Sequence, residues 1–143
     1  GNTSSNTKKS IISKTATDYS RGYDLFANGN HIEVVVRPYT SNNRLVFANT
    51  INANTWVCAA FTYDGSTIRG YLNGALDNTN IGIANAAIDS NGTMLYVGSR
   101  YAADANLTYT MSGRIGVVEV YNRKLSNNEI YSSYQTYRGR FGL

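Results

Sequence analysis

The chain has 143 residues, a net charge of +4 and only 15% charged residues, while 42% of its residues are hydrophobic. This length fits one domain with one core, and the composition excludes a disordered chain and a charged coiled coil. Eighteen Asn and thirteen Gly against one Pro supply the positive-φ positions that many tight turns need. These totals indicate a β protein with short strands.

Charge and cysteine content exclude several kinds of partner and site. The thirteen basic residues are spread along the chain and match no nucleic-acid-binding motif, so we expect no nucleic-acid partner. No run approaches the ~20 apolar residues of a membrane helix, so we expect no membrane insertion. One cysteine, Cys58, and one histidine, His31, can form neither an internal disulfide nor a tetrahedral zinc site.

The chain begins with a polar leader at residues 1–8, rich in Asn, Thr and Ser, which we expect to be flexible. A single domain is expected from residue 9 to residue 143. Ile11 and Ile12 form the apolar centre of its first strand.

The next strands are predicted from alternation of apolar residues and from turn signals. Residues 21–27 and 31–37 flank Asn28-Gly29-Asn30, a strong turn signal, and form a predicted hairpin. A further strand is expected at residues 44–48. The side chains assigned to the core are Ile32, Val34, Val36, Leu45 and Phe47.

Three consecutive strands are predicted next, at residues 56–63, 67–72 and 75–78. Asp64-Gly65-Ser66 separates the first two strands, and Asn73-Gly74 is the strongest short hairpin signal available. The segment therefore predicts an antiparallel meander.

Two more strands are expected at residues 94–98 and 114–121. The second is apolar on both faces, which predicts a central strand. Between them, residues 99–111 have no clear period and are rich in Tyr, Ala, Asn and Asp. Loops of this kind are where binding residues concentrate, so we expect this loop to be functional.

A short helix is expected to begin at Ser126. Ser126 and Glu129 form a capping box, in which the two side chains satisfy exposed backbone N–H groups reciprocally. We expect the helix to end at Gly139. Its predicted apolar face consists of Ile130, Tyr134 and Tyr137.

A succession of motifs gives a family resemblance. Residues 56–65 read as a Trp strand ending in a Thr-Tyr-Asp turn, and residues 71–74 as a Tyr-x-Asn-Gly hairpin, which together resemble the laminin-G-like, concanavalin-like lectin/glucanase superfamily. The match extends over residues 9–137 and implies an all-β fold, an antiparallel β-sandwich of the concanavalin-like jelly-roll type with one short C-terminal helix. The further matching blocks are residues 95–98, 112–116, 121–123, 125–126 and 129–130.

The two ends of the chain add to this resemblance. The family has two or more strands before the segment that corresponds to Ile11 to Lys14, so the domain at 9–143 is expected to lack the first family strands. A longer precursor or a partner chain would supply them. The ending Arg138 to Leu143 resembles the tails of laminin-G-like virion proteins of tailed bacteriophages. The alternative interpretation of this ending is that it is simply the end of the last helix, with Phe141 and Leu143 capping the core.

Catalysis is not expected. Glucanases of this fold carry a Glu-x-Asp-x-x-Glu pattern on one strand face, which supplies the nucleophile and the acid. Here Glu33, Glu119 and Glu129 lie on three separate predicted elements. His31 adjoins a turn and has no neighbouring serine-elbow motif, so a Ser-His-Asp triad is not supported either.

Glycan binding is the site chemistry that the residues fit best. Sugars are held by aromatic faces together with amide and charged groups, and Arg100, Tyr101, Asp104, Asn106 and Tyr109 place that set in one loop. The alternative is that these side chains bury against neighbouring strands or subunits; Tyr39 and Asn42 carry the same ambiguity. No metal site is assigned. Members of the superfamily often bind calcium, and Asp77, Asp89 and Asp104 are candidate ligands by position only.

The leading functional hypothesis is a non-catalytic structural or adhesion domain at a virion surface, in a capsid decoration or tail or fibre protein. Its expected partners are other virion subunits, as a homo-oligomer or multicopy assembly, with weak glycan contact strengthened by copy number. The alternative is a carbohydrate-binding module of a secreted bacterial protein.

Overall fold

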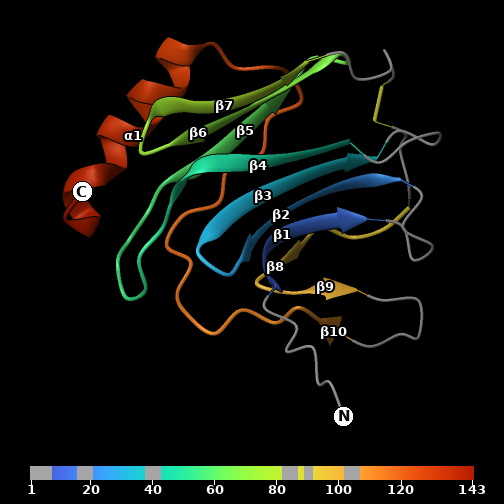
Figure 1. The fold of residues 1–143 in the computed structure, drawn as a ribbon, viewed down its shortest axis with the longest axis horizontal. Coiled ribbons are helices and arrows are strands. Elements are labelled where there is room, and N and C mark those ends of the chain that lie inside the picture. The colour runs from blue at the N-terminus through green and yellow to red at the C-terminus, as the bar shows by residue number, and fades with distance from the viewer. Residues whose placement is uncertain (1–7, 16–20, 38–42, 82–86, 89–91, 102–106) are drawn as a thin grey trace.

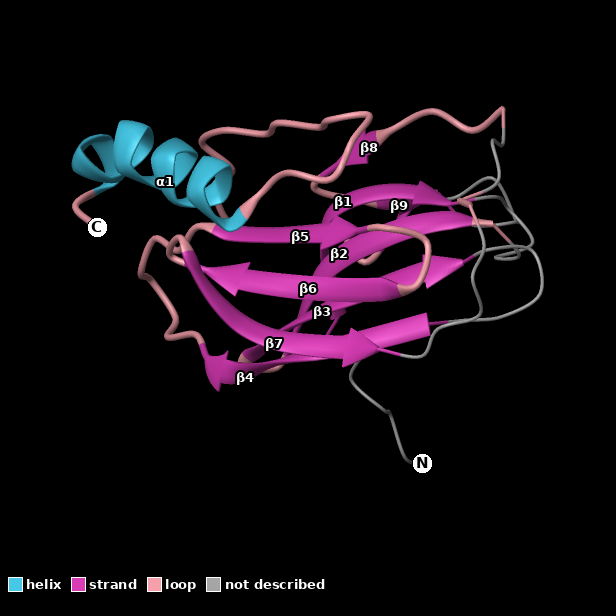
Figure 2. Ribbon diagram, turned by 90° about the horizontal axis from the view of Figure 1, so that it is seen from above, coloured by secondary structure: helices cyan, strands magenta, loops and turns pink. Residues whose placement is uncertain are grey.

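The computed structural model describes residues 8–15, 21–37, 43–81, 87–88, 92–101 and 107–143. Two antiparallel sheets pack against each other, with one helix at an end of the molecule (Figures 1 and 2), which confirms the predicted fold class. The elements are β1 (Lys8–Thr15), β2 (Gly22–Asn28), β3 (His31–Arg37), β4 (Asn43–Thr50), β5 (Ala59–Tyr63), β6 (Thr67–Leu72), β7 (Ala75–Ile81), β8 (Tyr96–Val97), β9 (Arg100–Tyr101), β10 (Leu107–Thr108) and α1 (Asn127–Phe141).

The larger sheet has the strand order β4-β3-β2-β1-β8. The predicted hairpin is confirmed, since Asn28 pairs with His31 across a turn in which Gly29 has a φ of 60°. Alternate residues of β3 face the smaller sheet, and the three that were assigned to the core are fully buried. These core side chains are Ile32, Val34 and Val36.

The smaller sheet has the order β5-β6-β7 and confirms the predicted meander. Its central strand packs on the larger sheet through Ile68, which is fully buried. At Gly70 of β6, an added Cβ would lie 2.5 Å from the ring of Phe47 on β4. A glycine at this position therefore lets the two sheets approach closely.

The first predicted strand of the meander is shorter than expected. Strand β5 begins at Ala59, and Trp56 stands outside it with its ring 4.7 Å from that of Phe141. Cys58 instead contacts the hairpin turn, where its N–H and C=O bond to the side chain and N–H of Asn73. These contacts hold the segment before β5 to the turn and to α1.

The edges of β4 and β7 are joined through side chains. The carboxylate of Asp77 accepts hydrogen bonds from the backbone N–H groups of Ala48 and Asn49. The amides of Asn78 and Asn80 donate to backbone carbonyls of β4. The polar face of β7 therefore satisfies backbone groups that an edge strand otherwise leaves open.

The prediction of a central strand at residues 114–121 is wrong. The segment is not in a strand, and Val118 and Val120 are exposed. It lies against α1, where the ring of Phe141 covers Gly116 and the carboxylate of Glu119 accepts hydrogen bonds from the helix. Contacts with the helix thus take the place of a strand ladder. The strand expected at 94–98 is reduced to the two residues of β8.

Helix α1 has the predicted capping box, in which Ser126 and Glu129 bond reciprocally. The helix does not end at Gly139 but continues to Phe141, because Gly142 takes the left-handed C-cap with a φ of 71°. Ile130 and Tyr134 are buried as expected. In the described part of the chain, no helix has the length and hydrophobicity that crossing a bilayer would require.

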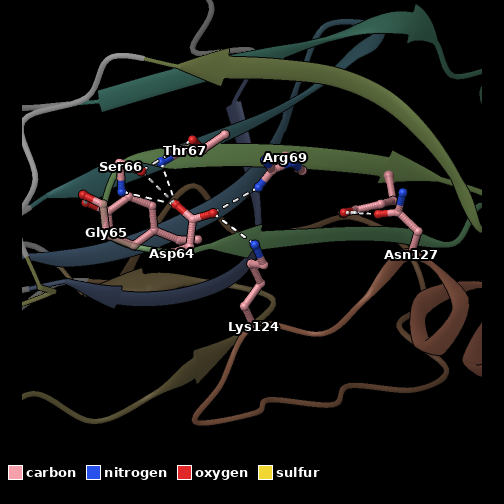
Figure 3. Close-up of polar contacts among 9 residues, drawn as sticks. Asp64, Gly65, Ser66, Thr67, Arg69, Lys124 and Asn127 are labelled. Carbon is pink, nitrogen blue, oxygen red and sulfur yellow. Dashed lines mark hydrogen bonds and ion pairs between the residues drawn. The ribbon is translucent and has the colours of Figure 1, made fainter.

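The turn between β5 and β6 is held by Asp64 (Figure 3). One carboxylate oxygen accepts bonds from the backbone N–H groups of Ser66 and Thr67, and the other from the side chains of Arg69 and Lys124. Desolvation raises the pKa of this carboxyl, but the bonds from Lys124, Arg69 and Ser66 outweigh it and hold the pKa well below its usual value. Asp64 therefore ties the chain before α1 to the smaller sheet.

Substituting Gly70 by alanine should destabilise the fold by about 2 kcal/mol, because the new methyl group would overlap the ring of Phe47. The matched control is Gly139→Ala in α1, where an added Cβ meets nothing within 4 Å and should stabilise the helix by up to about 1 kcal/mol. Urea unfolding followed by circular dichroism measures both. Equal stabilities for the two variants would contradict this account of sheet packing.

The contribution of Asp64 should depend on pH. Because its folded pKa lies below the unfolded value of about 3.9, the ionised carboxylate stabilises the fold at neutral pH, and this contribution declines as the pH falls below about 4. Asp64 is solvent-exposed, so we expect Asp64→Asn to cost only about 1 kcal/mol at neutral pH, and less in acid. Unfolding free energies of both proteins across this range would test it; a difference that grows on acidification would be inconsistent.

Candidate functional site

The larger sheet has a second face, turned away from the smaller sheet, which we call the outer sheet face. Figure 1 shows the β9–β10 hairpin on the β1 side of this sheet, away from β4. The chain just after β10 bonds to the edge of β1, since Ser10 of β1 donates its backbone N–H to the backbone carbonyl of Tyr109 at 2.7 Å. The buried side chains of β1 to β3 on this face are Ser10, Ser13, Thr15, Asp24, Phe26, Glu33, Val35 and Arg37.

Asp24 is the centre of a buried polar network on this face. Its Oδ1 accepts hydrogen bonds from Ser13 Oγ at 2.5 Å and Thr15 Oγ1 at 2.9 Å. Its Oδ2 accepts one from Arg37 Nη1 at 2.5 Å and lies 3.9 Å from Arg100 Nη2. Asp24 is 2% exposed and Arg100 is 9% exposed. The carboxylate therefore holds β1, β2, β3 and β9 together in a dehydrated environment.

Tyr109 has an unusual backbone conformation for a residue with a side chain, with a φ of 52°. Its ring centroid lies 5.4 Å from the guanidinium carbon of Arg100 and 5.9 Å from Nζ of Lys8. A bulky residue in the left-handed region costs conformational energy, and such residues cluster at binding and active sites. The hairpin thus presents an aromatic ring beside two cations.

Glu33 lies across the same face from the hairpin. Its Oε1 accepts hydrogen bonds from Asn28 Nδ2 at 3.0 Å and from Arg44 Nη2 at 2.5 Å. Its Oε2, and the Oγ of Ser10, are buried without a hydrogen-bond partner among the described residues. Buried polar atoms are nearly always bonded, so two such atoms on one face indicate a place where water or a ligand completes the network.

The outer sheet face and the hairpin carry an excess of positive charge. Phe26 lies at its centre, with Nζ of Lys8 5.1 Å from the ring centroid. Among the described residues of this face and hairpin, four basic groups accompany two acidic groups, which favours a ligand that bears negative charge. The charged residues are Lys8, Arg37, Arg44 and Arg100, with Asp24 and Glu33.

The structure brings together two of the predicted sugar-binding residues, Arg100 and Tyr109. Tyr101 pairs with Leu107 in the short β9–β10 hairpin, in a segment expected to be an irregular loop. Asp104, Asn106, Tyr39 and Asn42 lie outside the described residues. Arg100 is nearly buried, which agrees with the alternative that some of these side chains serve packing.

Sequence reasoning missed the strand residues of the site. Asp24 was read only as a position between core residues, and Glu33 only as one of three dispersed glutamates on the other face of its strand, although a charged residue within a buried strand signals a partnered site. Lys8 was placed in the leader, but it is the first residue of β1. Arg44 was read as the start of a strand, and its bond to Glu33 could not be expected without the register of β3 and β4.

The calcium prediction remains a prediction. Asp77 uses both carboxylate oxygens to accept bonds from the backbone of β4. Asp89 and Asp104 lie outside the described residues. Within the residues that the structure places, no group of three or more His, Cys, Asp or Glu side chains could hold a metal ion.

The three glutamates are held apart in different settings. Glu33 is buried on β3, Glu119 bonds to Ser133 and Tyr137, and Glu129 pairs with Arg123. The bonds from Arg123, and then from Ser126, lower the pKa of Glu129 to about 2, so this carboxylate is ionised and unsuited to donate a proton at neutral pH.

Replacing Asp24 by asparagine should destabilise the fold by about 3 kcal/mol, because it removes the buried negative charge that bonds to Arg37 and lies close to Arg100. The control is Asp77→Asn, whose carboxylate contacts only N–H groups and whose loss should cost about 1 kcal/mol. Urea unfolding of the two variants gives the comparison. If Asp24→Asn lowers the free energy of unfolding no more than Asp77→Asn does, the buried network does not stabilise the fold.

Comparison with known proteins adds a family and several structural neighbours. A laminin G family model, described as the concanavalin A-like lectin/glucanases superfamily, matches residues 2–131. A search of curated protein sequences found no match.

Among solved structures, the CBM40 module of Ruminococcus gnavus IT-sialidase bound to alpha2,3 sialyllactose is similar, with a TM-score of 0.74 and 19% identity over 92% of this chain and 77% of that chain. The receptor binding domain of botulinum neurotoxin type G has a TM-score of 0.63 and 17% identity over 91% of this chain and 32% of that chain. At these identities the similarity shows a shared fold. Because the family model covers most of its length, the chain belongs to the concanavalin A-like lectin/glucanases superfamily.

Proposed function

We propose that this protein is a carbohydrate-binding module and that the outer sheet face beside the β9–β10 hairpin is its sugar site. The conformation of Tyr109 carries the proposal, since its aromatic ring, on a strained backbone, lies close to both Arg100 and Lys8. Aromatic rings contact the C–H surfaces of sugars, while flanking cations and amides bond to hydroxyl or acidic groups.

The buried acceptors on the same face support this function. A sugar hydroxyl is a hydrogen-bond donor, and neither Oε2 of Glu33 nor Oγ of Ser10 receives a hydrogen bond from a described residue. A bound hydroxyl that reached either atom, directly or through water, would satisfy a group that is costly to leave unpaired. Discrimination between sugars would follow from these positions, because a saccharide without the matching hydroxyl leaves the acceptor unpaired.

The charge of the face favours an acidic sugar, since four basic groups outnumber two acidic ones among the residues that the structure describes there. A module of the same fold is bound to alpha2,3 sialyllactose, which carries a carboxylate. We therefore assign the protein to saccharide recognition outside the cell, as a binding module rather than an enzyme.

A virion role is the weaker alternative. It rests on the resemblance of the chain ending, yet the residues Arg138 to Phe141 form the last turn of α1. The ring of Phe141 packs on Trp56 and Gly116. These contacts agree with the simpler interpretation of the ending as a helix that caps the core.

A glycan array first identifies saccharides that bind the protein. Isothermal titration calorimetry with alpha2,3 sialyllactose and with lactose then measures their dissociation constants. Tyr109→Ala should weaken binding at least tenfold, since a central aromatic anchor is worth more than about 1 kcal/mol. Tyr131→Ala, which removes an exposed tyrosine from α1, should bind like the parent. No binding of any arrayed glycan by the parent protein, or unchanged binding by Tyr109→Ala, would refute it.

A further inference from the structure

A groove lies between helix α1 and the segment that precedes it. Its volume is about 450 Å³, which falls in the range of about 300–1,000 Å³ that is typical of small-ligand sites. The segment contributes alternate residues to the groove, and the helix contributes side chains one turn apart. The charged and aromatic lining residues, with one serine, are Glu119, Tyr121 and Arg123 of the segment and Glu129, Ser133 and Tyr137 of the helix.

The charges of this groove do not balance. Arg123 pairs with Glu129 through two hydrogen bonds, from Nη2 to Oε1 at 2.7 Å and from Nη1 to Oε2 at 3.1 Å. Glu119 instead accepts bonds from the neutral hydroxyls of Ser133 and Tyr137, at 2.8 and 2.9 Å. Among the residues that the structure describes, no ion pair includes Glu119. The groove therefore holds one negative charge that no described side chain neutralises.

The carboxylate of Glu119 has room for further hydrogen bonds. Oε1 accepts a bond from Tyr137 and Oε2 accepts one from Ser133, whereas a carboxylate offers about four acceptor positions. The hydrogen bond to Glu119, and then the charge of that carboxylate, raise the pKa of Tyr137 above its usual value, so the phenol stays protonated at neutral pH. The two hydroxyls thus position the carboxylate at the groove without neutralising it.

A positively charged organic group fits these features best. The carboxylate of Glu119 attracts such a group, and an ammonium ion also binds to aromatic rings such as those of Tyr121 and Tyr137. An anionic ligand would be repelled by Glu119. A metal ion fits less well, because in the described part of the chain no group of three or more His, Cys, Asp or Glu side chains could hold one.

We propose that this groove binds a ligand with an organic ammonium group, held by the charge of Glu119 and by contact with Tyr121 and Tyr137. A protonated amine would donate hydrogen bonds to the carboxylate, whereas a quaternary ammonium would depend on the aromatic rings. The lining of the groove includes none of the side chains named on the outer sheet face. This site is therefore independent of the proposed sugar site.

An NMR titration of the ¹⁵N-labelled full chain at neutral pH tests this proposal with three small probes. Ethanolamine carries a protonated amine, choline carries a quaternary ammonium, and N-acetylethanolamine is neutral. At least one of the two cations should give saturable shifts on the backbone amides of Glu119, Tyr121 and Tyr137. The neutral probe should bind at least about fivefold more weakly, since it lacks the charge. Tighter binding of ethanolamine would indicate hydrogen bonds to Glu119, and tighter binding of choline would indicate aromatic contact.

Two variants separate the charge of the groove from the fold. Glu119→Gln removes the charge but keeps an acceptor for Ser133 and Tyr137, and should weaken cation binding at least about fivefold. Asp77→Asn removes a carboxylate from β7, outside the groove, and should bind like the parent. Circular dichroism confirms that both variants are folded. The proposal is overturned if neither cation gives saturable shifts at the groove, if the neutral probe binds equally well, or if Glu119→Gln binds like the parent.

Discussion

The carboxylate of Asp24 is the contact on which the proposed site depends. It accepts hydrogen bonds from side chains of β1 and β3, and it lies 3.9 Å from Arg100 of β9. Because Asp24, Arg37 and Arg100 are buried, the attraction between the carboxylate and the two guanidinium groups is little weakened by solvent. The same cluster that stabilises the larger sheet therefore fixes the guanidinium that lies over the ring of Tyr109. Asp24 therefore contributes both to the stability of the fold and to the position of Arg100 beside the ring of Tyr109.

The edge strand β4 and the apolar segment 114–121 are covered by different kinds of contact within the chain. The β4 edge is closed within the chain, by Asp77, Asn78 and Asn80 of β7. The apolar segment 114–121 has helix α1 on one side, where Phe141 and the hydroxyls of Ser133 and Tyr137 contact it.

Local patterns were sufficient to predict most of the fold. Turn dipeptides and period-two alternation gave the β2–β3 hairpin and the meander, and the capping box gave the start of α1. Segment 114–121 was wrongly predicted to be a strand. Its apolar pattern indicates which side chains could be buried, but it does not indicate whether a neighbouring strand is present to pair with it. For the site, composition identified Arg100 and Tyr109. Asp24 and Glu33 were overlooked although a charge within a buried strand is a signal, and Arg44 could not be found because its bond to Glu33 depends on the register of β3 and β4.

The central claim is that a saccharide binds at the outer sheet face beside Tyr109. The most direct measurement is a titration of the ¹⁵N-labelled protein with alpha2,3 sialyllactose, followed by NMR chemical shifts. The account predicts that the largest shifts fall on the backbone amides of Ser10, Arg100 and Tyr109, and on the side-chain Nε–H of Arg100. Saturable shifts confined to the smaller sheet and α1, or no saturable shift at all, would contradict it.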